Sequence, residues 1–369
     1  MNICIVDFAH QGHHRFYIQQ IVDLPCVTGF VGHEDLAKLF GERQETMAMT
    51  TVNKVPRKQS DKIRVIKQHL DTHPSPDEFF LMFADQLSSI LLRCAISGRA
   101  SIAGVPVGGI WFRSNFLYRK GLLAFVKRSI SIHLLTTWSR SRQRLFYLDD
   151  LLAREVALRC GVDEDFFWCR EPYAVDLKPG ALDSSKAEEP VSLLFIGSQG
   201  ERKGTAWAIR ALADAQLSNA IRIHIAGVIR DEEIFVAVEL ARDAGIEVIV
   251  DNRFLDVSEY DAAFKRCDIV MLPYRDFGGS SGVLIEAAQY RKPVIATNYG
   301  TIGRIVRLSG FGVVYSPCDE INFISSLHRL INKLEDLDFD KGYEKILYQC
   351  CPKRFKKMIA RVHSITNSE

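Results

Sequence analysis

Residues 277–300, FGGSSGVLIEAAQYRKPVIATNYG, are the stretch that decides the fold class. A loop rich in glycine and serine leads into an apolar helix with one acid, Glu286, and a short apolar strand, 294–297, follows. Parallel strands need such a helical crossover, and a strand buried on both faces is continuously apolar. The stretch therefore predicts one α/β repeat of a parallel sheet.

The same alternation extends in both directions along the chain. In the second half, strands are predicted at residues 191–197, 221–227, 246–250 and 268–274. In the first half, they are predicted at residues 2–8, 78–84, 105–112 and 144–148. We therefore expect an α/β protein with two Rossmann-like domains facing a cleft.

A polar segment separates the two arrays. Residues 177–190, LKPGALDSSKAEEP, contain proline, glycine and serine, which is typical of a linker. The predicted domains are then 1–176 and 191–340, and the C-terminal helical segment 341–369 is expected to pack back on the first of them.

The composition indicates a globular protein. The 369 residues are 47% hydrophobic and 25% charged, with a formal charge of +2, which excludes disordered and fibrous classes. No apolar run is long enough to span a membrane, and the N-terminus lacks the features of a signal peptide. Scattered cysteines without metal-like spacing are typical of reduced thiols in a cytoplasmic protein.

The loop after the predicted strand 191–197 is the first candidate for binding an anion. Its sequence, GSQGERKGT at 197–205, precedes a helix. The first N–H groups of a helix have no partner within it and its N-terminus is electropositive, so anions bind there. Arg202 and Lys203 add charges suited to a diphosphate. The alternative is a solvated turn, and the loop fits neither a Walker A nor a G-x-G-x-x-G motif.

The loop before Glu286 is the second candidate. Glycine and serine allow a phosphate to approach the amides of Gly282, Val283 and Leu284 at a helix start. One turn further on, the carboxylate of Glu286 can accept hydrogen bonds from the vicinal hydroxyls of a ribose, or can stabilise the helix N-terminus. Both loops follow strands of one half, at the ligand-binding edge of such sheets. Together they suggest a nucleoside-diphosphate site.

The second half resembles the donor-binding half of GT-B glycosyltransferases, specifically the retaining family 4, glycosyl transferases group 1. The matching stretches, within about 190–315, are LLFIGSQGERKGTAWAIRALA, VIVDNRFLDVSEYDAAFKRCDIVMLPY and SSGVLIEAAQYRKPVIATNYGTIGRIV. The first half matches more weakly, through GHHRFYIQQI.

This resemblance implies roles for the matching residues. Lys203 and Arg202 would hold the donor diphosphate, and Glu286 would bind the nucleoside ribose. Gly12, in the first loop, would lie near the transferred sugar. Four residues would supply backbone amides to phosphate and sugar: Ser281, Gly282, Val283 and Leu284.

The sequence departs from the family pattern at two positions of this half. The family usually has two glutamates separated by seven residues, but the position eight before Glu286 is Gly278, with Asp276 nearby as a substitute. The family arginine after the strand glycine is Ser198 here, so Arg202 would replace its charge.

Polar residues after strands of the first half are candidates for the acceptor side. Many family members have a histidine after the strand matching 105–112, where this chain has Arg113, which can bind a phosphate or hydroxyl but is no general base at neutral pH. His13 and His14 follow the first glycine loop and either reach the cleft or cap a helix at the surface. Asp85 is either a cleft residue or a helix N-cap.

Charge is unevenly distributed in the first half. Residues 86–148 contain no acid but ten Lys or Arg, and apolar residues recur there at helical spacing: Leu122, Val126, Ile130, Leu134 and Trp138. Such a basic helix within 113–144 can bind an anionic membrane or a lipid diphosphate, or can pack on its own sheet with a solvated basic face. No motif supports nucleic-acid binding.

We therefore expect a retaining glycosyltransferase that moves a hexose or related sugar from a nucleotide-diphosphate donor to an acceptor hydroxyl. The expected acceptor is a glycan or lipid-linked glycan, in polysaccharide or glycolipid assembly at the cytoplasmic face of a membrane. No metal or other cofactor is expected, because DLDFD at 336–340 follows no core strand. Two alternatives remain open: a binding protein without turnover, and a nucleotide-sugar epimerase of the same fold.

Overall fold

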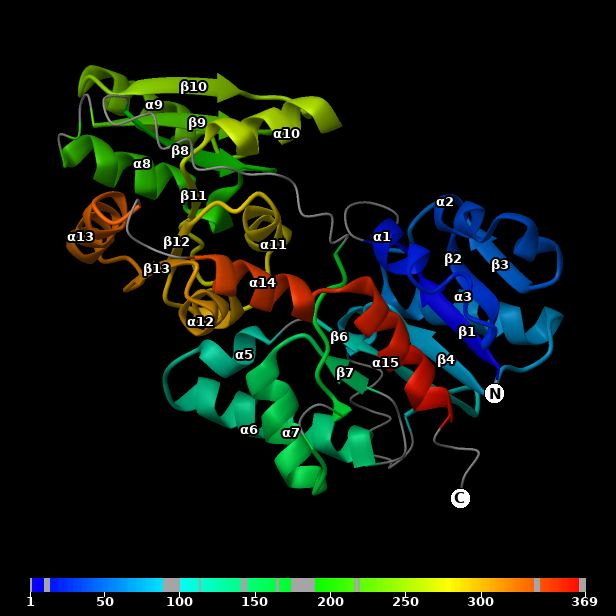
Figure 1. Cartoon of the computed structure of the whole chain (residues 1–369). Coiled ribbons are helices and arrows are strands. Elements are labelled where there is room, and N and C mark those ends of the chain that lie inside the picture. The colour runs from blue at the N-terminus through cyan, green and yellow to red at the C-terminus, as the bar shows by residue number, and fades with distance from the viewer. Residues whose placement is uncertain are drawn as a thin grey trace. The chain divides into compact units, whose positions relative to one another are not determined.

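The computed structural model describes residues 2–9, 14–88, 100–112, 114–140, 145–163, 166–173, 190–215, 217, 220–334 and 339–364. The chain divides into two compact units, the first being Met1–Ala174 with Cys350–Glu369 and the second Val175–Gln349. Each unit is a largely parallel sheet covered by helices (Figure 1). The predicted α/β class with two Rossmann-like domains is confirmed.

The first unit has a seven-stranded sheet in the order β3-β2-β1-β4-β6-β5, with β7 also paired to β6. Among these strands only β5 runs antiparallel to its neighbour. The strands are β1 (Ile3–Asp7), β2 (Val27–His33), β3 (Ala48–Val52), β4 (Glu78–Leu81), β5 (Ser101–Ile102), β6 (Val105–Trp111) and β7 (Leu145–Tyr147). The helices are α1 (His14–Gln19), α2 (Glu34–Ala37), η1 (Lys38–Glu45), α3 (Gln59–Thr72), η2 (Ala84–Leu87), α5 (Asn115–Tyr118), α6 (Leu122–Arg140), α7 (Asp150–Cys160) and α15 (Pro352–Ser364).

Alternate side chains of β1 pack in two apolar cores, one on each face of this sheet. Cys4 and Val6 pack in the core that α3, α6 and α7 complete. Ile3 and Ile5 pack in the core that includes α1 and α15. The ring of Phe355 in α15 meets that of Tyr17 in α1 edge-on, with centroids 5.6 Å apart. The last helix of the chain therefore covers the first sheet.

The second unit has a six-stranded parallel sheet in the order β10-β9-β8-β11-β12-β13. The strands are β8 (Val191–Ile196), β9 (Ile221–Ala226), β10 (Glu247–Asp251), β11 (Ile269–Leu272), β12 (Val294–Thr297) and β13 (Gly312–Tyr315). The helices are η4 (Glu201–Lys203), α8 (Thr205–Asp214), α9 (Glu233–Asp243), α10 (Val257–Arg266), α11 (Gly282–Gln289), α12 (Gly300–Ser309), α13 (Glu320–Ile331) and α14 (Asp340–Gln349).

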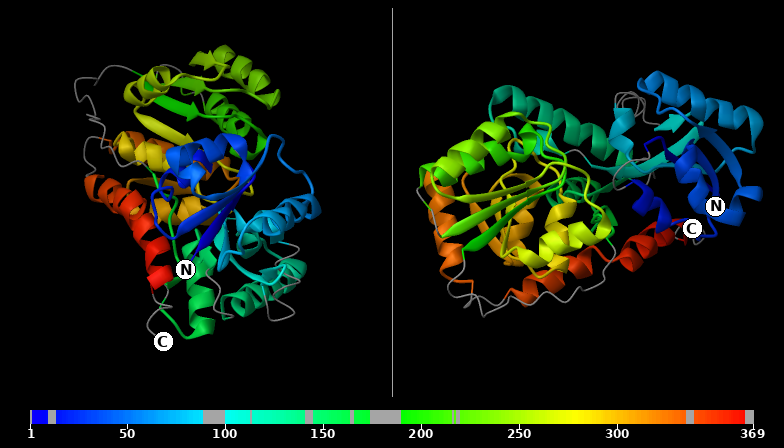
Figure 2. Two further views of the ribbon diagram at one scale, coloured as in Figure 1. Left: turned by 90° about the vertical axis from the view of Figure 1, so that its right-hand side faces the viewer. Right: turned by 90° about the horizontal axis from the view of Figure 1, so that it is seen from above.

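Helices cover both faces of this second sheet (Figure 2). Helix α8 packs against α9 and α13, whereas α14 packs against α11 and α12. Because α14 packs within the second unit, the C-terminal segment of the first unit begins at residue 350, nine residues after the expected start at 341. No helix in the described part of the chain is both long and apolar enough to cross a membrane.

The strand order of the second sheet locates its ligand edge. The chain order reverses between β8 and β11, because β9 and β10 lie on one side of this pair and β12 and β13 on the other. Open α/β sheets bind ligands outside the carboxyl ends of the strands at such a switch point. The loops that leave β8 and β11 here are the two loops that the sequence pattern indicates.

Candidate nucleotide-binding site

The loops after β8 and β11 are in direct contact. The amide of Arg275 donates a hydrogen bond to the carbonyl of Arg202, at 2.9 Å. Gly204 has a φ of +70°, and a Cβ at that position would lie 2.1 Å from the carbonyl oxygen of Pro273. Only glycine adopts a positive φ without strain and also allows a carbonyl oxygen to lie this close to its Cα. The glycine at 204 therefore joins the two loops and fixes the segment that carries Arg202 and Lys203.

A buried glutamine, which the sequence analysis did not identify, holds the first loop from inside. The side-chain nitrogen of Gln199 donates to the carbonyl of Gly197 at 2.9 Å, and its oxygen accepts from the hydroxyl of Thr205 at 2.7 Å. The backbone amide of Gln199 donates to the carbonyl of Val228, in the loop after β9, at 2.8 Å. These bonds order both ends of the loop, and glutamine in a polar loop gives no sequence signal for that role.

Lys203 reaches back toward the switch point. Its ammonium group donates to the carbonyl of Ile196, the last residue of β8, and lies 5.8 Å from the centre of the Tyr274 ring. Burial lowers the pKa of Lys203 to about 8; the nearby charge of Glu286 opposes this shift and that of Arg202 adds to it. A half-buried cation at the carboxyl end of β8 is suited to an anionic ligand.

Arg202 lies on the solvent side of the same loop. Its guanidinium group stands 4.4 Å from the centre of the Phe277 ring, in the loop after β11. Phe277 in turn stacks on Tyr274, with ring centres 5.2 Å apart. Stacking on an aromatic face leaves the guanidinium N–H groups available at the ring edge. Arg202 is exposed and Lys203 is half-buried, and both therefore lie beside the contact between the two loops.

The start of α11 has no side-chain cap. The N-cap residue Ser281 is buried, its hydroxyl is paired with that of Tyr274 at 2.9 Å, and it makes no capping hydrogen bond. The amide of Leu284 donates to the carbonyl of Ser281 at 3.1 Å in this structure. The amides of Gly282 and Val283 remain as the candidates for binding an anion.

Glu286 lies half-buried in α11 and is linked to α10. The hydroxyl of Tyr260 donates to its Oε2 at 2.5 Å. A carboxylate oxygen accepts more than one hydrogen bond, so this contact orients the carboxylate and leaves capacity for a ligand hydroxyl. Tyr260 was missed from the sequence because the contact joins residues 26 positions apart.

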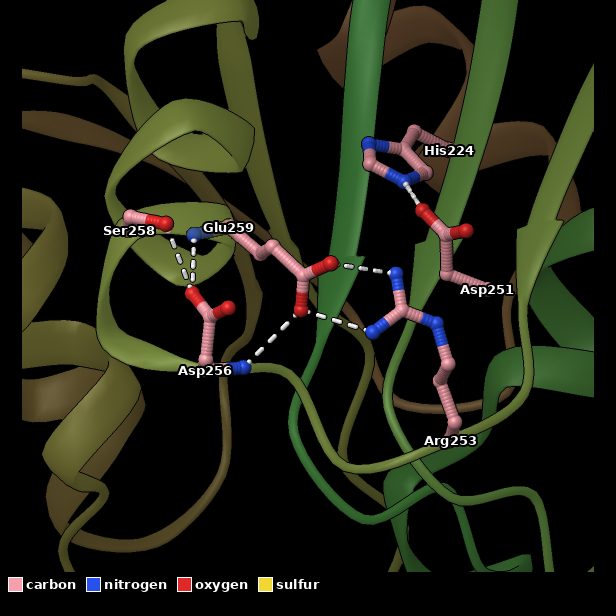
Figure 3. Close-up of polar contacts among 6 residues, drawn as sticks. All are labelled: His224, Asp251, Arg253, Asp256, Ser258 and Glu259. Carbon is pink, nitrogen blue, oxygen red and sulfur yellow. Dashed lines mark hydrogen bonds and ion pairs between the residues drawn. The ribbon is translucent and has the colours of Figure 1, made fainter.

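The first turn of α10, which presents Tyr260, is held by a polar network (Figure 3). The carboxylate of Asp256 accepts from the amide of Glu259 at 2.9 Å, and the carboxylate of Glu259 accepts from the amide of Asp256 at 3.0 Å. This capping box satisfies two helix-terminal donors. Arg253 adds two hydrogen bonds of 2.6 Å to Glu259. Separately, His224 of β9 pairs with Asp251 of β10 at 2.8 Å.

The segment that replaces the first family glutamate is packed against α12. The carbonyl of Gly278 accepts from the hydroxyl of Thr301 at 2.8 Å, and a Cβ on Gly300 would lie 2.6 Å from the Gly278 Cα. Asp276, the expected substitute, has a φ of +44° and accepts from the hydroxyl of Tyr299 at 3.0 Å. Its carboxylate is exposed and is oriented by that tyrosine.

The remaining expected site residues belong to the first unit. Asp85 is buried in the first turn of η2, whose N-cap is Phe83, so it is not the N-cap that the sequence offered as an alternative. Gly12, His13 and Arg113 lie outside the described residues. His14 is described, and it pairs with Asp7.

Comparison with known proteins identifies a family that the second unit resembles. Residues 190–333 match the family model of glycosyl transferases group 1. No curated protein sequence is similar enough to this chain to count as a match. The resemblance of the second half to glycosyl transferases group 1 is thus confirmed over residues 190–333.

Solved structures match the chain over its length. HepE of Anabaena in complex with UDP matches with a TM-score of 0.66 and 16% identity, over 99% of this chain and 100% of that one. Sucrose-phosphate synthase of Thermosynechococcus elongatus matches with a TM-score of 0.66 and 12% identity, over 100% and 99%. WaaG, a glycosyltransferase involved in lipopolysaccharide biosynthesis, matches with a TM-score of 0.60 and 15% identity, over 97% and 99%. The fold is that of GT-B glycosyltransferases.

Proposed function

We propose that the protein transfers a glycosyl group, with retention, from a nucleoside-diphosphate sugar to an acceptor hydroxyl. One observation carries the proposal: Lys203 and the uncapped start of α11 meet at the switch point, with Glu286 one turn further along α11. The first two suit a diphosphate, and a carboxylate suits a ribose. The proposed acceptor is a glycan or lipid-linked glycan, in keeping with neighbours such as WaaG.

The chemistry follows from charge. The diphosphate gains negative charge as its bond to the sugar breaks, and preorganised donors at that point lower the barrier. Lys203, Arg202 and the amides of Gly282 and Val283 supply such donors. This arrangement needs no metal ion, so we propose that transfer proceeds without one.

Binding of nucleoside diphosphates tests the proposal, and UDP is included because HepE is bound to UDP in its structure. UDP, ADP and GDP are compared by thermal shift, first without metal and then with magnesium. A nucleotide that binds the folded state raises the melting temperature by mass action. We expect a shift with one base, and its loss in Glu286→Ala. No shift with any nucleotide would refute the proposal.

The corresponding nucleotide sugars then separate the enzyme from its two alternatives. Release of nucleoside diphosphate, with sugar passed to water or to an added glycan, supports a transferase. Tight binding with an intact donor after many hours supports the binding protein without turnover. A donor whose sugar changes configuration while still attached to the nucleotide supports the epimerase. Proton NMR of the early product gives the anomeric configuration and tests retention.

The first half of α6 supports a further proposal, contact with an anionic membrane. Leu122 and Leu123 are 79% and 78% exposed, and further along the helix Phe125, Val126 and Ile130 are also exposed. The sequence pattern suggested one apolar face ending at Trp138. Instead, Trp138 is buried and its indole donates to the carbonyl of Val107 at 3.0 Å, so only the C-terminal half of α6 packs on the sheet.

The charge around this exposed apolar segment favours an anionic lipid surface as its partner. Arg119, Lys120 and Lys127 are exposed beside it, in a stretch of sequence that contains no acid. Basic residues next to an inserted apolar face strengthen binding to anionic lipids. The full chain should sediment with phosphatidylcholine vesicles that contain phosphatidylglycerol, and less with phosphatidylcholine alone. Leu122→Ser with Leu123→Ser should abolish this, whereas Leu158→Ser, 69% exposed on α7, should not.

A further inference from the structure

The first unit has its own switch point, which the family match at 190–333 does not cover. Strands β2 and β3 lie on one side of β1, and β4 and β6 on the other, so the chain order reverses between β1 and β4. The carboxyl end of β1 is Asp7, and Phe83 follows β4. By the same topological rule, this is where the first unit should bind a ligand.

A histidine–aspartate pair occupies this point. The Nδ1 of His14, at the start of α1, lies 2.8 and 2.9 Å from the two carboxylate oxygens of Asp7. The Asp7 side chain is 1% exposed, and its Oδ1 also accepts from the amide of Ala9 at 3.2 Å. Burial raises the pKa of Asp7, while the contact with His14, the Ala9 amide and the charge of Lys62 oppose that rise.

This pairing selects one form of the imidazole. A carboxylate can only accept from Nδ1–H, so neutral His14 carries its proton on Nδ1 and a free lone pair on Nε2. Asp7 is the sole polar partner of His14 among the described residues. Within the described part of the chain, the Nε2 edge is therefore a hydrogen-bond acceptor that no other residue uses, at the ligand edge of the sheet.

Aromatic rings hold the imidazole in place. His14 stacks on Phe83 with ring centres 3.7 Å apart, and Phe83 stacks on Phe112, after β6, with ring centres 4.2 Å apart. Tyr17 of α1 contacts both phenylalanine rings at 5.8 and 5.6 Å. The stack restricts rotation of His14 and places two half-buried apolar rings beside it. A polar acceptor next to aromatic rings is suited to a sugar, which has both hydroxyl and C–H surfaces.

We propose that this pair is the acceptor subsite: His14 Nε2 accepts a hydrogen bond from a hydroxyl of the acceptor sugar, and Asp7 is the residue that positions it. The inference rests on the proposed transferase function, which requires an acceptor hydroxyl to be bound. The sequence offered both histidines of this loop, His13 and His14, and the structure describes only His14.

NMR of the full chain labelled with 15N-histidine tests the proposal. The probes are the methyl α- and β-glycosides of glucose, galactose and mannose. His14→Gln identifies the His14 signals, and His224, which is paired to Asp251 in the second unit, is the internal control. We expect neutral His14 to be protonated at Nδ1, and at least one glycoside to shift its Nε2 signal without moving those of His224.

Asp7→Asn sharpens the test, because an amide no longer fixes the tautomer. We expect a population protonated on Nε2 and about tenfold weaker glycoside binding, the effect of one lost hydrogen bond. If this variant fails to fold, the wild-type titration still decides. Wild-type His14 protonated on Nε2, or UDP binding without any glycoside effect on His14, overturns the inference and leaves the transferase proposal standing. Glycoside binding at His14 without nucleotide binding supports the subsite and refutes the transferase.

Discussion

The two switch points of this molecule are built in different ways. In the second unit, the loops after β8 and β11 meet through backbone contacts at Gly204, and charged side chains are added to that frame. In the first unit, the equivalent point between β1 and β4 is formed by side chains, with His14 held between Asp7 and Phe83. A frame of backbone amides suits phosphate, whatever the attached group, whereas a single oriented side chain suits one hydroxyl.

The largest effect should come from breaking the backbone frame. In Gly204→Ala the new Cβ would meet the Pro273 oxygen at 2.1 Å, so the two loops must separate. We expect UDP binding to fall at least about 100-fold, and the free energy of unfolding to fall by about 2–3 kcal/mol. Calorimetry and chemical denaturation measure the two effects. Gly200→Ala is the matched control, because a Cβ there meets nothing within 4 Å.

The ribose contact should come next in size. Glu286→Ala removes a carboxylate that we expect to accept from the ribose, which costs about 2–3 kcal/mol, or about 30- to 150-fold in affinity for UDP. The same substitution should lower the affinity for 2′-deoxy-UDP much less, because that nucleotide lacks one of the two hydroxyls that Glu286 is expected to bind. Equal losses with both nucleotides would place Glu286 away from the 2′-hydroxyl. Glu239→Ala, exposed on α9, should change neither affinity.

Lys203 gives the nucleotide site a dependence on pH. Its pKa of about 8 means that the ammonium group is charged below pH 8 and loses its proton above it. UDP binding above pH 8 must then take up a proton, so affinity should fall by at most about tenfold per pH unit. Calorimetry at pH 7, 8 and 9 in two buffers measures affinity and proton uptake together. Lys203→Arg, charged throughout, should remove the dependence; an unchanged profile would assign it to another group.

The same lysine affects stability in the opposite sense. An unfolded lysine titrates near pH 10.4, so between about pH 8 and pH 10.4 the unfolded chain binds more protons than the folded one. The contribution of Lys203 to the free energy of unfolding therefore rises with pH over this window. The free energy of unfolding of the wild type should therefore rise relative to that of Lys203→Met between pH 7.5 and pH 9.5. Chemical denaturation of both proteins at the two pH values measures this change.

The contrast between the two units also explains what the sequence could predict. Continuous apolar strands and glycine loops made five of the six strands of the second sheet and its loops predictable, whereas β13 was missed. In the first unit β2 was missed because glycines interrupt its apolar pattern; Gly32 is needed there because a Cβ would lie 1.9 Å from the carbonyl oxygen of Asp7. That requirement arises only once β1 and β2 are paired.

Side-chain partnerships were equally hidden. The adjacent pair His13-His14 offered no basis for choosing one histidine, because the choice depends on how α1 starts relative to Asp7. The link from Tyr260 to Glu286 depends on the packing of α10 beside α11. The positions of Lys203 and Glu286 were predictable because local motifs carry them, whereas their supporting partners come from elsewhere in the chain.

The smallest expected effect concerns the support of Tyr260. Asp256 caps α10 and Arg253 pairs with Glu259, yet both contacts are on the surface (Figure 3). A lost N-cap costs about 1 kcal/mol of stability, whereas an exposed ion pair contributes about 0–1 kcal/mol. We therefore expect Asp256→Ala to lower the denaturation midpoint measurably and Arg253→Ala hardly at all.

The effect on function should follow the same order, because the cap and not the ion pair fixes the turn that presents Tyr260. Asp256→Ala should weaken UDP binding a fewfold, and Tyr260→Phe should weaken it about as much, since both free the Glu286 carboxylate to rotate. The double variant should then lose little more than either alone, because the two changes act through one contact. Additive losses would show that the α10 cap acts on the ligand independently of Glu286. In that case the second unit, like the first, would depend on a side-chain arrangement as well as on its backbone frame.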